Sequence, residues 1–290
     1  MRCAVNPLLG KNLDLTSLVK PGQEKQVMVI GGGPGGMMVA QTLRQMGHRV
    51  DLYEKSNRLG GLLNDATVAP FKEYLRLYKQ WDIRQTELCG AILHLNTEVT
   101  AQMVRELSPD AIIVATGSQY IRPSVPGVDG SKVKMVRDVE HHTVPVGQTV
   151  VVCGGGVVGL ECAIMLGMEG KSVTVIDMIP KQDFGKSLPV FNHIEVMHQL
   201  EKYGVTLWGD RKIVRFDDDV VVTVDSCGQE HLYAGHTFVL ALGVRPEDRL
   251  LNELRSLYAE GVYAVGDCVS AGRLVAHANQ DGFHAAIRIR

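Results

Sequence analysis

The chain has 290 residues, of which 45% are hydrophobic and 21% are charged, and its formal net charge at pH 7 is −2. This length suits two domains, and the composition is that of a globular protein with ample core. The near-neutral charge gives no reason to expect nucleic acid or an anionic membrane as a partner. No apolar run is long enough to span a membrane, and the first 20 residues lack a secretory pattern, so we expect a cytoplasmic protein.

The cysteines are scattered and contain no C-x-x-C pair. This spacing argues against a disulphide framework, a zinc site and a dithiol redox centre within these residues. The six positions are Cys3, Cys89, Cys153, Cys162, Cys227 and Cys268.

After an irregular, polar stretch at residues 1–24, the chain is organised around residues 26–54. The apolar run Val27–Ile30 predicts a buried parallel strand, and a glycine-rich turn and a helix with one apolar face follow it. A second apolar run, Val50–Tyr53, ends in Glu54, about 20 residues beyond the glycines, where an acid accepts hydrogen bonds from a ribose diol. This order of strand, turn, helix, strand and acid predicts a dinucleotide site.

The glycine turn fits the pattern G-x-G-x-x-G at Gly31, Gly33 and Gly36. The first glycine permits the tight turn, and the second lets a pyrophosphate approach the backbone. The third lets the helix pack closely on the strand. The phosphates then lie on unpaired N–H groups at the N-terminus of the helix.

The next stretch contains further elements of the same unit. The periodicity of residues 70–83 predicts an amphipathic helix with Phe71, Tyr74, Leu75, Tyr78 and Trp81 on one side. Residues 91–95 and 110–115 are expected to be strands, with a short helix at 99–107 between them. The second of these strands closes on Ala115-Thr116-Gly117, and a proline-rich passage that suits a domain crossover follows.

The dinucleotide pattern then repeats, about 120 residues after the first copy. A buried strand at Thr149–Cys153 leads into a second G-x-G-x-x-G, a helix is expected at Leu160–Glu169, and a strand at Ser172–Ile176 ends in Asp177. The glycines of the second copy are Gly154, Gly156 and Gly159. This internal duplication predicts an α/β fold with two doubly wound, Rossmann-like dinucleotide-binding domains, the second inserted in the first.

The remaining elements complete both units. A helix is expected at 190–203, short strands at 205–208, 212–216 and 220–224, and a strand at 237–242 that ends before Gly243. Finally, a strand is expected to begin at residue 261 and to be followed by Gly266 and Asp267, and residues 273–290 are expected to be helical.

Together these motifs resemble the flavoprotein reductases with two dinucleotide-binding domains, over nearly the whole chain from Lys25 onward. The run Arg2-Cys3-Ala4-Val5-Asn6-Pro7 is similar to the passage that holds the last cysteine of a four-iron cluster in 2,4-dienoyl-CoA reductases, 2-enoate reductases and trimethylamine dehydrogenase. Leu59-Gly60-Gly61 and Ala69-Pro70-Phe71-Lys72-Glu73 are also similar to that family. In those enzymes a flavin-bearing barrel and three more cluster cysteines come first, and both are absent from this sequence.

The resemblance implies a division of the chain and a set of cofactor contacts. Residues 1–24 are a remnant of the iron–sulphur segment, 25–120 and 246–290 form an FAD-binding domain, and 121–245 form an NAD(P)H-binding domain. The residues expected to hold FAD are Gly31, Gly33, Gly36, Glu54, Arg58, Leu62 and Asp267, and those expected to hold NADH are Gly154, Gly156, Gly159, Glu161 and Asp177. Their motif neighbours complete the cofactor-binding set: Pro34, Lys55, Gly61, Thr116, Gly117, Val158, Gly243 and Gly266.

Several of these residues have a second interpretation. Arg58 is equally compatible with a solvated surface charge, and Glu161 with a favourable charge near a helix N-terminus. For Asp267 the second interpretation is a helix N-cap, and the companion motifs favour the cofactor contact over it. Asp177 repels a 2′-phosphate and accepts from a free diol, so NADH is favoured over NADPH, although Lys181 nearby can soften that preference.

The function implied is an NADH-oxidising FAD module of an enoate- or dienoyl-CoA-reductase-like enzyme. Because no C-x-x-C is present, the reduced flavin has to discharge outside this chain, to the missing N-terminal iron–sulphur and FMN-barrel domain or subunit. Two alternatives stay open. One is a structural module that holds only ADP, as in trimethylamine dehydrogenase, and the other is a free-standing flavin or ferredoxin reductase.

Overall fold

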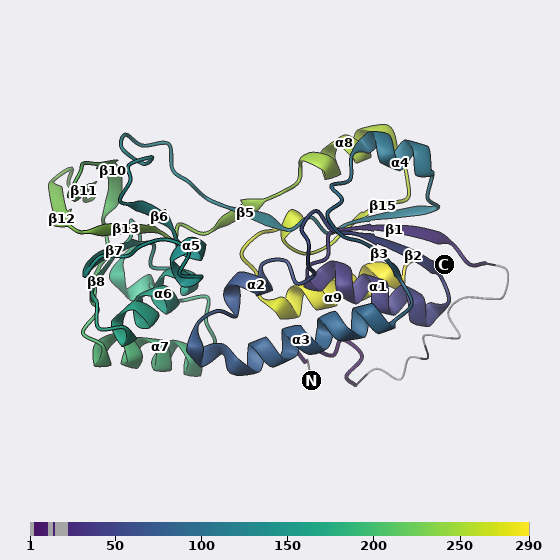
Figure 1. Ribbon diagram of the computed structural model, residues 1–290, viewed down its shortest axis with the longest axis horizontal. Coiled ribbons are helices and arrows are strands. Elements are labelled where there is room, and N and C mark those ends of the chain that lie inside the picture. The colour runs from purple at the N-terminus through teal and green to yellow at the C-terminus, as the bar shows by residue number, and fades with distance from the viewer. Residues whose placement is uncertain (1–2, 11–13, 15–22, 290) are drawn as a thin grey trace. The chain divides into compact units, whose positions relative to one another are not determined.

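The structure is a computed structural model that describes residues 3–10, 14 and 23–289. It forms two compact units (Figure 1). The first comprises the described residues within 1–67, 73–119 and 244–290, and the second comprises 68–72 and 120–243. The predicted α/β class is confirmed. Much of the linker expected at residues 1–24 lies outside the described residues, and residues 3–10 form neither a helix nor a strand.

The first unit is built on a parallel five-stranded sheet with the order β15-β4-β1-β2-β3. Its central strand β1 is buried at each residue from Val27 to Ile30, as expected where helices cover both faces of a parallel sheet. The strands are β1 (Gln26–Ile30), β2 (Arg49–Tyr53), β3 (Ile92–His94), β4 (Ala111–Val114) and β15 (Val262–Ala264).

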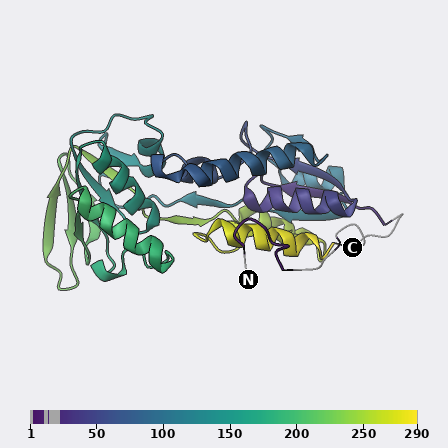
Figure 2. The same ribbon diagram turned by 90° about the horizontal axis from the view of Figure 1, so that it is seen from below.

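Helices α1 and α9 lie side by side on this sheet, and α3 packs against α1 (Figures 1 and 2). Met37 and Leu43 on α1 and Phe283 on α9 are among the fully buried side chains of the main core of the unit. The helices of the unit are α1 (Pro34–Met46), α2 (Leu63–Ala66), α3 (Glu73–Leu88), α4 (Ala101–Leu107), α8 (Arg249–Leu257) and α9 (Val275–Ala286).

The apolar side of α3 is not its buried side. Tyr74 is 87% exposed and Trp81 is 51% exposed, whereas the polar residues Asp82 and Thr86 are fully buried. The reason is that α1 presents the polar side chain of Gln41, whose Nε2 donates to Asp82 Oδ1 at 2.8 Å and to Thr86 Oγ1 at 2.9 Å. Buried polar groups require partners, and α3 supplies them here instead of apolar contacts.

The second unit contains a parallel sheet of order β6-β13-β7-β8-β9 and an antiparallel sheet of order β10-β11-β12. Helix α6 begins at Val157, three residues before the predicted start, and its apolar residues lie buried over the parallel sheet. The elements are β6 (Val133–Met135), α5 (Val136–Glu140), β7 (Thr149–Cys153), α6 (Val157–Met168), β8 (Ser172–Ile176), α7 (Val190–Lys202), β9 (Thr206–Trp208), β10 (Lys212–Phe216), β11 (Val220–Val224), β12 (Glu230–Ala234) and β13 (Thr237–Leu240).

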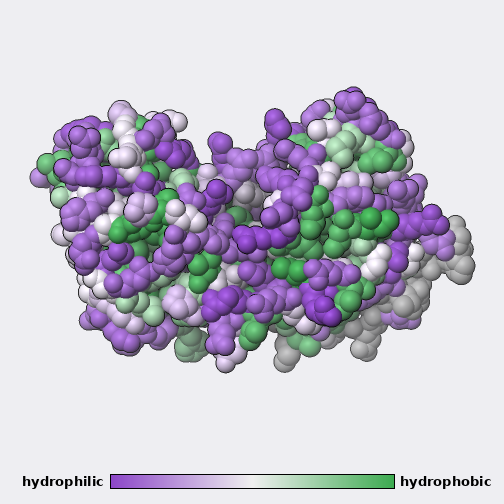
Figure 3. Space-filling view, in the orientation of Figure 1, coloured by the Kyte–Doolittle hydropathy of each residue, from purple (hydrophilic) through white to green (hydrophobic). Residues whose placement is uncertain are grey.

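Two short strands, β5 (Ser118–Tyr120) and β14 (Val244–Pro246), pair where the chain leaves and re-enters the first unit. Hydrophilic residues predominate on the face seen in Figure 3, with hydrophobic residues gathered in smaller areas on each unit. Within the described residues, no helix has the length and hydropathy needed to cross a bilayer.

Candidate functional site

The first glycine turn separates glycines that the fold requires from one that it does not. Gly31 has φ 113°, and a Cβ there would lie 2.2 Å from the backbone oxygen of Ala115. At Gly36 a Cβ would lie 1.9 Å from the oxygen of Gly31. At Gly33, by contrast, the nearest atom would be Gly61 Cα, 3.9 Å away. Packing therefore explains the first and third glycines, whereas a Cβ at Gly33 would make only an ordinary van der Waals contact.

The second turn repeats this division. A Cβ at Gly154, which has φ 135°, would lie 2.2 Å from the oxygen of Ala241, and one at Gly159 would lie 2.0 Å from the oxygen of Gly154. A Cβ at Gly156 would meet nothing within 4 Å. No described residue crowds this position, so the open space beside its backbone fits the approach of a pyrophosphate, as the motif predicts.

The helices that follow both turns can accept an anion at their N-termini. Helix α1 starts after Gly33 and α6 after Gly156, and neither N-cap forms a side-chain hydrogen bond. Neither helix has an acidic residue in its first turn. The N–H groups and the positive end of each helix dipole are therefore left to a bound phosphate.

The acids at the ends of the second strands take equivalent positions. Glu54 is 8% exposed, and its Oε2 and Oε1 accept from the backbone N–H groups of Gly32 and Ser56, each at 2.8 Å. Asp177 accepts from Gly155 N at 2.6 Å and from Ile179 N at 3.1 Å. These bonds fix each carboxylate beside its glycine turn, with lone pairs left for a diol.

The turn after Glu54 folds back over the first glycine loop. Gly60 N donates to Gly32 O at 2.8 Å, and a Cβ at Gly61 would lie 2.9 Å from Gly33 Cα. Leu62 precedes α2 directly. Gly33, Gly61 and Leu62, three of the predicted FAD-binding residues, therefore lie together at this turn. Lys55 and Arg58 are exposed, and their contact with a cofactor stays a prediction.

The closing turn of the first unit meets the Gly266-Asp267 segment. Asp267 Oδ2 accepts from Ser118 Oγ at 3.0 Å and from Gly272 N at 3.3 Å. The N-cap of α9 is Leu274, so Asp267 does not cap that helix. On the same side, Thr116 Oγ1 donates to the oxygen of Glu247 at 2.6 Å. Asp267 is therefore oriented by the turn that closes the first unit.

Gly117 and Gly243 both have positive φ, 74° and 83°. A Cβ at either would meet nothing within 4 Å, so their backbone conformation, and not crowding, favours glycine there.

Glu161 forms an ion pair with Lys72 that the sequence did not predict. Both residues belong to the second unit, because residues 68–72 pack there. Glu161 is the fifth residue of α6, beyond the first turn, which weakens its interpretation as a favourable helix-end charge. Its side chain is 14% exposed, so the ion pair sets its orientation. The sequence separation of Lys72 from the second glycine motif left no signal by which to find it.

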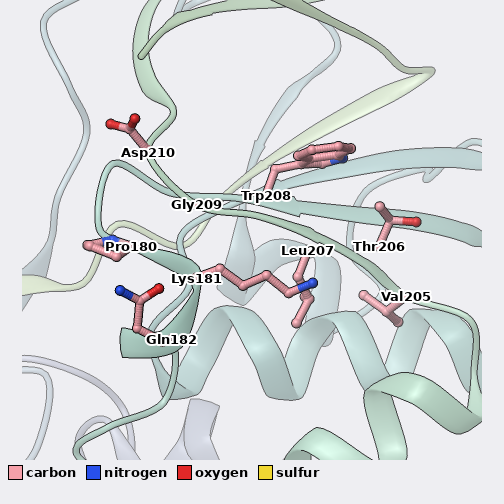
Figure 4. Close-up of a pocket in the computed structure, with 9 residues that line it drawn as sticks. All are labelled: Pro180, Lys181, Gln182, Val205, Thr206, Leu207, Trp208, Gly209 and Asp210. Carbon is pink, nitrogen blue, oxygen red and sulfur yellow. The ribbon is translucent and has the colours of Figure 1, made fainter. Parts of the chain in front are cut away.

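A pocket of about 490 Å³ opens beside the loop that follows Asp177 (Figure 4). Lys181 lines it, and in Figure 4 its side chain points along the pocket toward Leu207. The lining residues are Pro180, Lys181, Gln182, Val205, Thr206, Leu207, Trp208, Gly209 and Asp210. Lys181 is thus close in the chain to Asp177, and its influence on the choice between NADH and NADPH stays a prediction.

Residues 25–282 match the pyridine nucleotide-disulphide oxidoreductase family. The chain belongs to this family. The predicted class, an NAD(P)H-dependent oxidoreductase, is thereby confirmed. All six cysteines are free. Burial raises the pKa of the thiols of Cys153, Cys162 and Cys268, so these three are held as thiols and not as reactive thiolates.

Comparison with individual proteins places the chain more specifically within this family. The chain is 30% identical to an NADH oxidase of Thermoanaerobacter brockii over 100% of its own length and 44% of that protein. It is 32% identical to a bilirubin reductase of Mediterraneibacter gnavus, over 99% of its length and 44% of that protein. A 2-naphthoyl-CoA reductase structure superposes with a TM-score of 0.87 at 28% identity, and the match covers 100% of this chain and 44% of that one.

The chain therefore spans less than half the length of these relatives. The predicted resemblance to the reductase portion of enoate-reductase-like flavoproteins is confirmed. A thioredoxin reductase of T. acidophilum, at 20% identity and a TM-score of 0.69, shares the fold alone.

Proposed function

We propose that this chain is an NADH-oxidising FAD module of an enoate- or dienoyl-CoA-reductase-like enzyme. The first unit binds FAD and the second binds NADH. The observation that carries this proposal is the repetition of one geometry in both units: an open second glycine, an uncapped helix N-terminus and an anchored acid. Bound FAD supplies the capacity to accept a hydride from nicotinamide and to pass its electrons on.

The residues of the chain bind and orient the two cofactors. The N-termini of α1 and α6 hold the pyrophosphates, and Glu54 and Asp177 accept hydrogen bonds from the ribose diols. Asp267, oriented by Ser118, holds the flavin side of FAD through its ribityl chain or the adjoining hydroxyls. Glu161, held by Lys72, orients the nicotinamide. No side chain has to move a proton for the hydride to pass.

The electrons leave to an acceptor outside these residues. We propose that this acceptor is an iron–sulphur and FMN centre, either a further domain or a partner subunit. The support is the likeness of residues 2–7 to a cluster-cysteine passage and the similarity to a 2-naphthoyl-CoA reductase and to a cinnamate reductase of Clostridium sporogenes. Whichever acceptor is used, transfer from NADH to FAD comes first.

Purified protein incubated with excess FAD should retain it through desalting and show the visible spectrum of an oxidised flavin. The reason is that Glu54, Asp267 and the N-terminus of α1 contribute to one site. Protein that retains ADP but no flavin would favour the structural, ADP-binding alternative instead.

Replacing Asp177 with alanine should weaken NADH binding by about 1–3 kcal/mol, the scale of a hydrogen bond to a charged group. NADPH binding should improve, since the carboxylate no longer repels the 2′-phosphate. Dissociation constants for both cofactors, measured by calorimetry, test this. The matched variant Glu54→Ala should leave the NADH constant unchanged, and an Asp177→Ala protein with unaltered constants would remove Asp177 from the site.

A further inference from the structure

A buried polar network in the first unit joins α1, α3, α9 and the N-terminal segment 3–10. Asp82 and Asn279 are fully buried and come from α3 and α9. The segment is docked on the same unit, with Pro7 buried and Leu8 packed against the main core. Asn279 Nδ2 donates to the backbone oxygen of Ala4 at 2.9 Å, so the network reaches the segment directly.

The hydrogen bonds between the side chains of this network are all donated toward Asp82. The same Nδ2 also lies 2.7 Å from Tyr78 Oη, so both amide hydrogens of Asn279 are used. Tyr78 then accepts from Asn279 and donates its own hydrogen to Asp82 Oδ2, at 3.3 Å. The other oxygen of Asp82 accepts from Gln41 Nε2 at 2.8 Å. Asp82 is therefore the terminal acceptor that fixes the direction of each bond.

This direction leaves one atom unsatisfied. Asn279 Oδ1 is buried and has no hydrogen-bond partner among the described residues. An unpaired buried acceptor is unfavourable, and reversing the amide would let Oδ1 accept from Tyr78. The reversed amide would, however, place Oδ1 against the oxygen of Ala4 and break that contact. The oxygen of Ala4 therefore opposes the reversal, and Asp82 opposes it as well, because it holds the tyrosine hydrogen and leaves Tyr78 an acceptor toward the amide.

We propose that Asn279 is a positioning residue that fastens segment 3–10 to the first unit, and that Asp82 sets the orientation of its amide through Tyr78. Because this segment carries Cys3, the network controls where that thiol lies. The inference concerns the chain alone and does not rest on the proposed function.

The docking of segment 3–10 on the first unit is expected to respond to pH. Burial raises the pKa of Asp82 to about 6, and burial together with Asp82 raises that of Tyr78. The titratable groups facing this pair are Tyr78 on α3 and Cys3 on the segment, while α1 and α9 contribute the neutral amides of Gln41 and Asn279. Burial in the docked arrangement raises the pKa of Asp82, so the docked state holds a proton that a hydrated Asp82 in the open state releases. Docking is therefore strongest below this pKa and weakens as the pH rises through it.

The thiol of Cys3 reports the docking without any cofactor. Alkylation by iodoacetamide at constant pH, resolved by mass spectrometry, compares Cys3 with the exposed Cys227 and the buried Cys268. In Asn279→Leu, Cys3 should react about fivefold faster relative to Cys227, the shift expected from one lost hydrogen bond. Cys268, in the same unit, should stay protected. The proposal would be overturned if Cys3 reacted at the same rate in Asn279→Leu and in the wild-type protein. It would also be overturned if the labelling of Cys268 rose in step with that of Cys3.

The pH profile separates positioning from a general loss of packing. Amide hydrogen exchange of residues 4–9, corrected for intrinsic rates, should show the opening of the wild-type segment increase about fivefold from pH 5 to pH 7.5. In Asp82→Asn, and in Tyr78→Phe should the first variant not fold, the profile should be flat. A variant profile that still follows the wild type would refute the role of Asp82.

Discussion

Replacing Gly156 with valine should weaken NADH binding about 100-fold or more, while the second unit keeps its stability and the first keeps FAD. An added Cβ at this position meets no atom of the described residues within 4 Å, so we expect the fold to accommodate a branched side chain there. The valine would instead occupy the space beside the N-terminus of α6 that the pyrophosphate requires, and such overlap costs about 3 kcal/mol, or a factor of about 100. Calorimetric titration with NADH and thermal denaturation of the same sample measure both effects.

The equivalent substitution in the first unit serves as the matched control. Gly33→Val should impair retention of FAD and leave NADH binding unchanged, since Gly33 has the same place in the first motif and a Cβ there would meet only Gly61 Cα, at 3.9 Å. A Gly156→Val protein that binds NADH normally would show that this turn is only a structural feature. A protein that loses stability in step with binding would contradict the division between glycines that the fold requires and those that a ligand requires.

Substituting Gly36 with alanine should destabilise the first unit by about 3 kcal/mol or more. The new Cβ would lie 1.9 Å from the backbone oxygen of Gly31. Because this neighbour is backbone within the turn and not the end of a flexible side chain, α1 has to move away from β1. The main core of the unit, which includes Met37 and Leu43, would be disturbed with it. Urea denaturation followed by circular dichroism gives the change in the free energy of unfolding.

The control for this experiment adds the same methyl group to the same loop without overlap. Gly33→Ala should change the free energy of unfolding by less than about 1 kcal/mol, because its Cβ would be 3.9 Å from the nearest atom. Equal losses in both variants would mean that helix propensity or loop entropy, and not the close approach of α1 to β1, decides the stability of this turn.

The parts of the fold that follow from local pattern could be predicted from the sequence. The strands at Val27–Ile30 and Thr149–Cys153 are apolar runs that precede glycine turns, and they form the centres of the two parallel sheets. The acids Glu54 and Asp177 lie where the spacing placed them, each bonded to its glycine turn. These features can be predicted from one sequence because each depends on residues close together in the chain and because the glycine turns allow few other residue types.

Features that depend on pairing across the chain could not be predicted. The ion pair of Lys72 with Glu161 joins residues 89 positions apart, and neither residue has a distinguishing neighbour pattern. On α3 the spacing of the apolar residues does not mark the buried face, because the polar partner of Asp82, Gln41, is on another helix. The strands β6 (VKM) and β12 (EHLYA) were missed because each is short and carries charged or polar residues in place of an apolar run.

Anaerobic mixing of the FAD-loaded protein with NADH tests the central claim most directly. If the first unit holds FAD and the second delivers NADH to it, the visible absorbance of the oxidised flavin should bleach. The Gly156→Val protein, loaded with the same amount of FAD, should bleach far more slowly at the same NADH concentration. Flavin that remains oxidised in the wild-type protein at saturating NADH would contradict the assignment of these two units as an NADH-oxidising module.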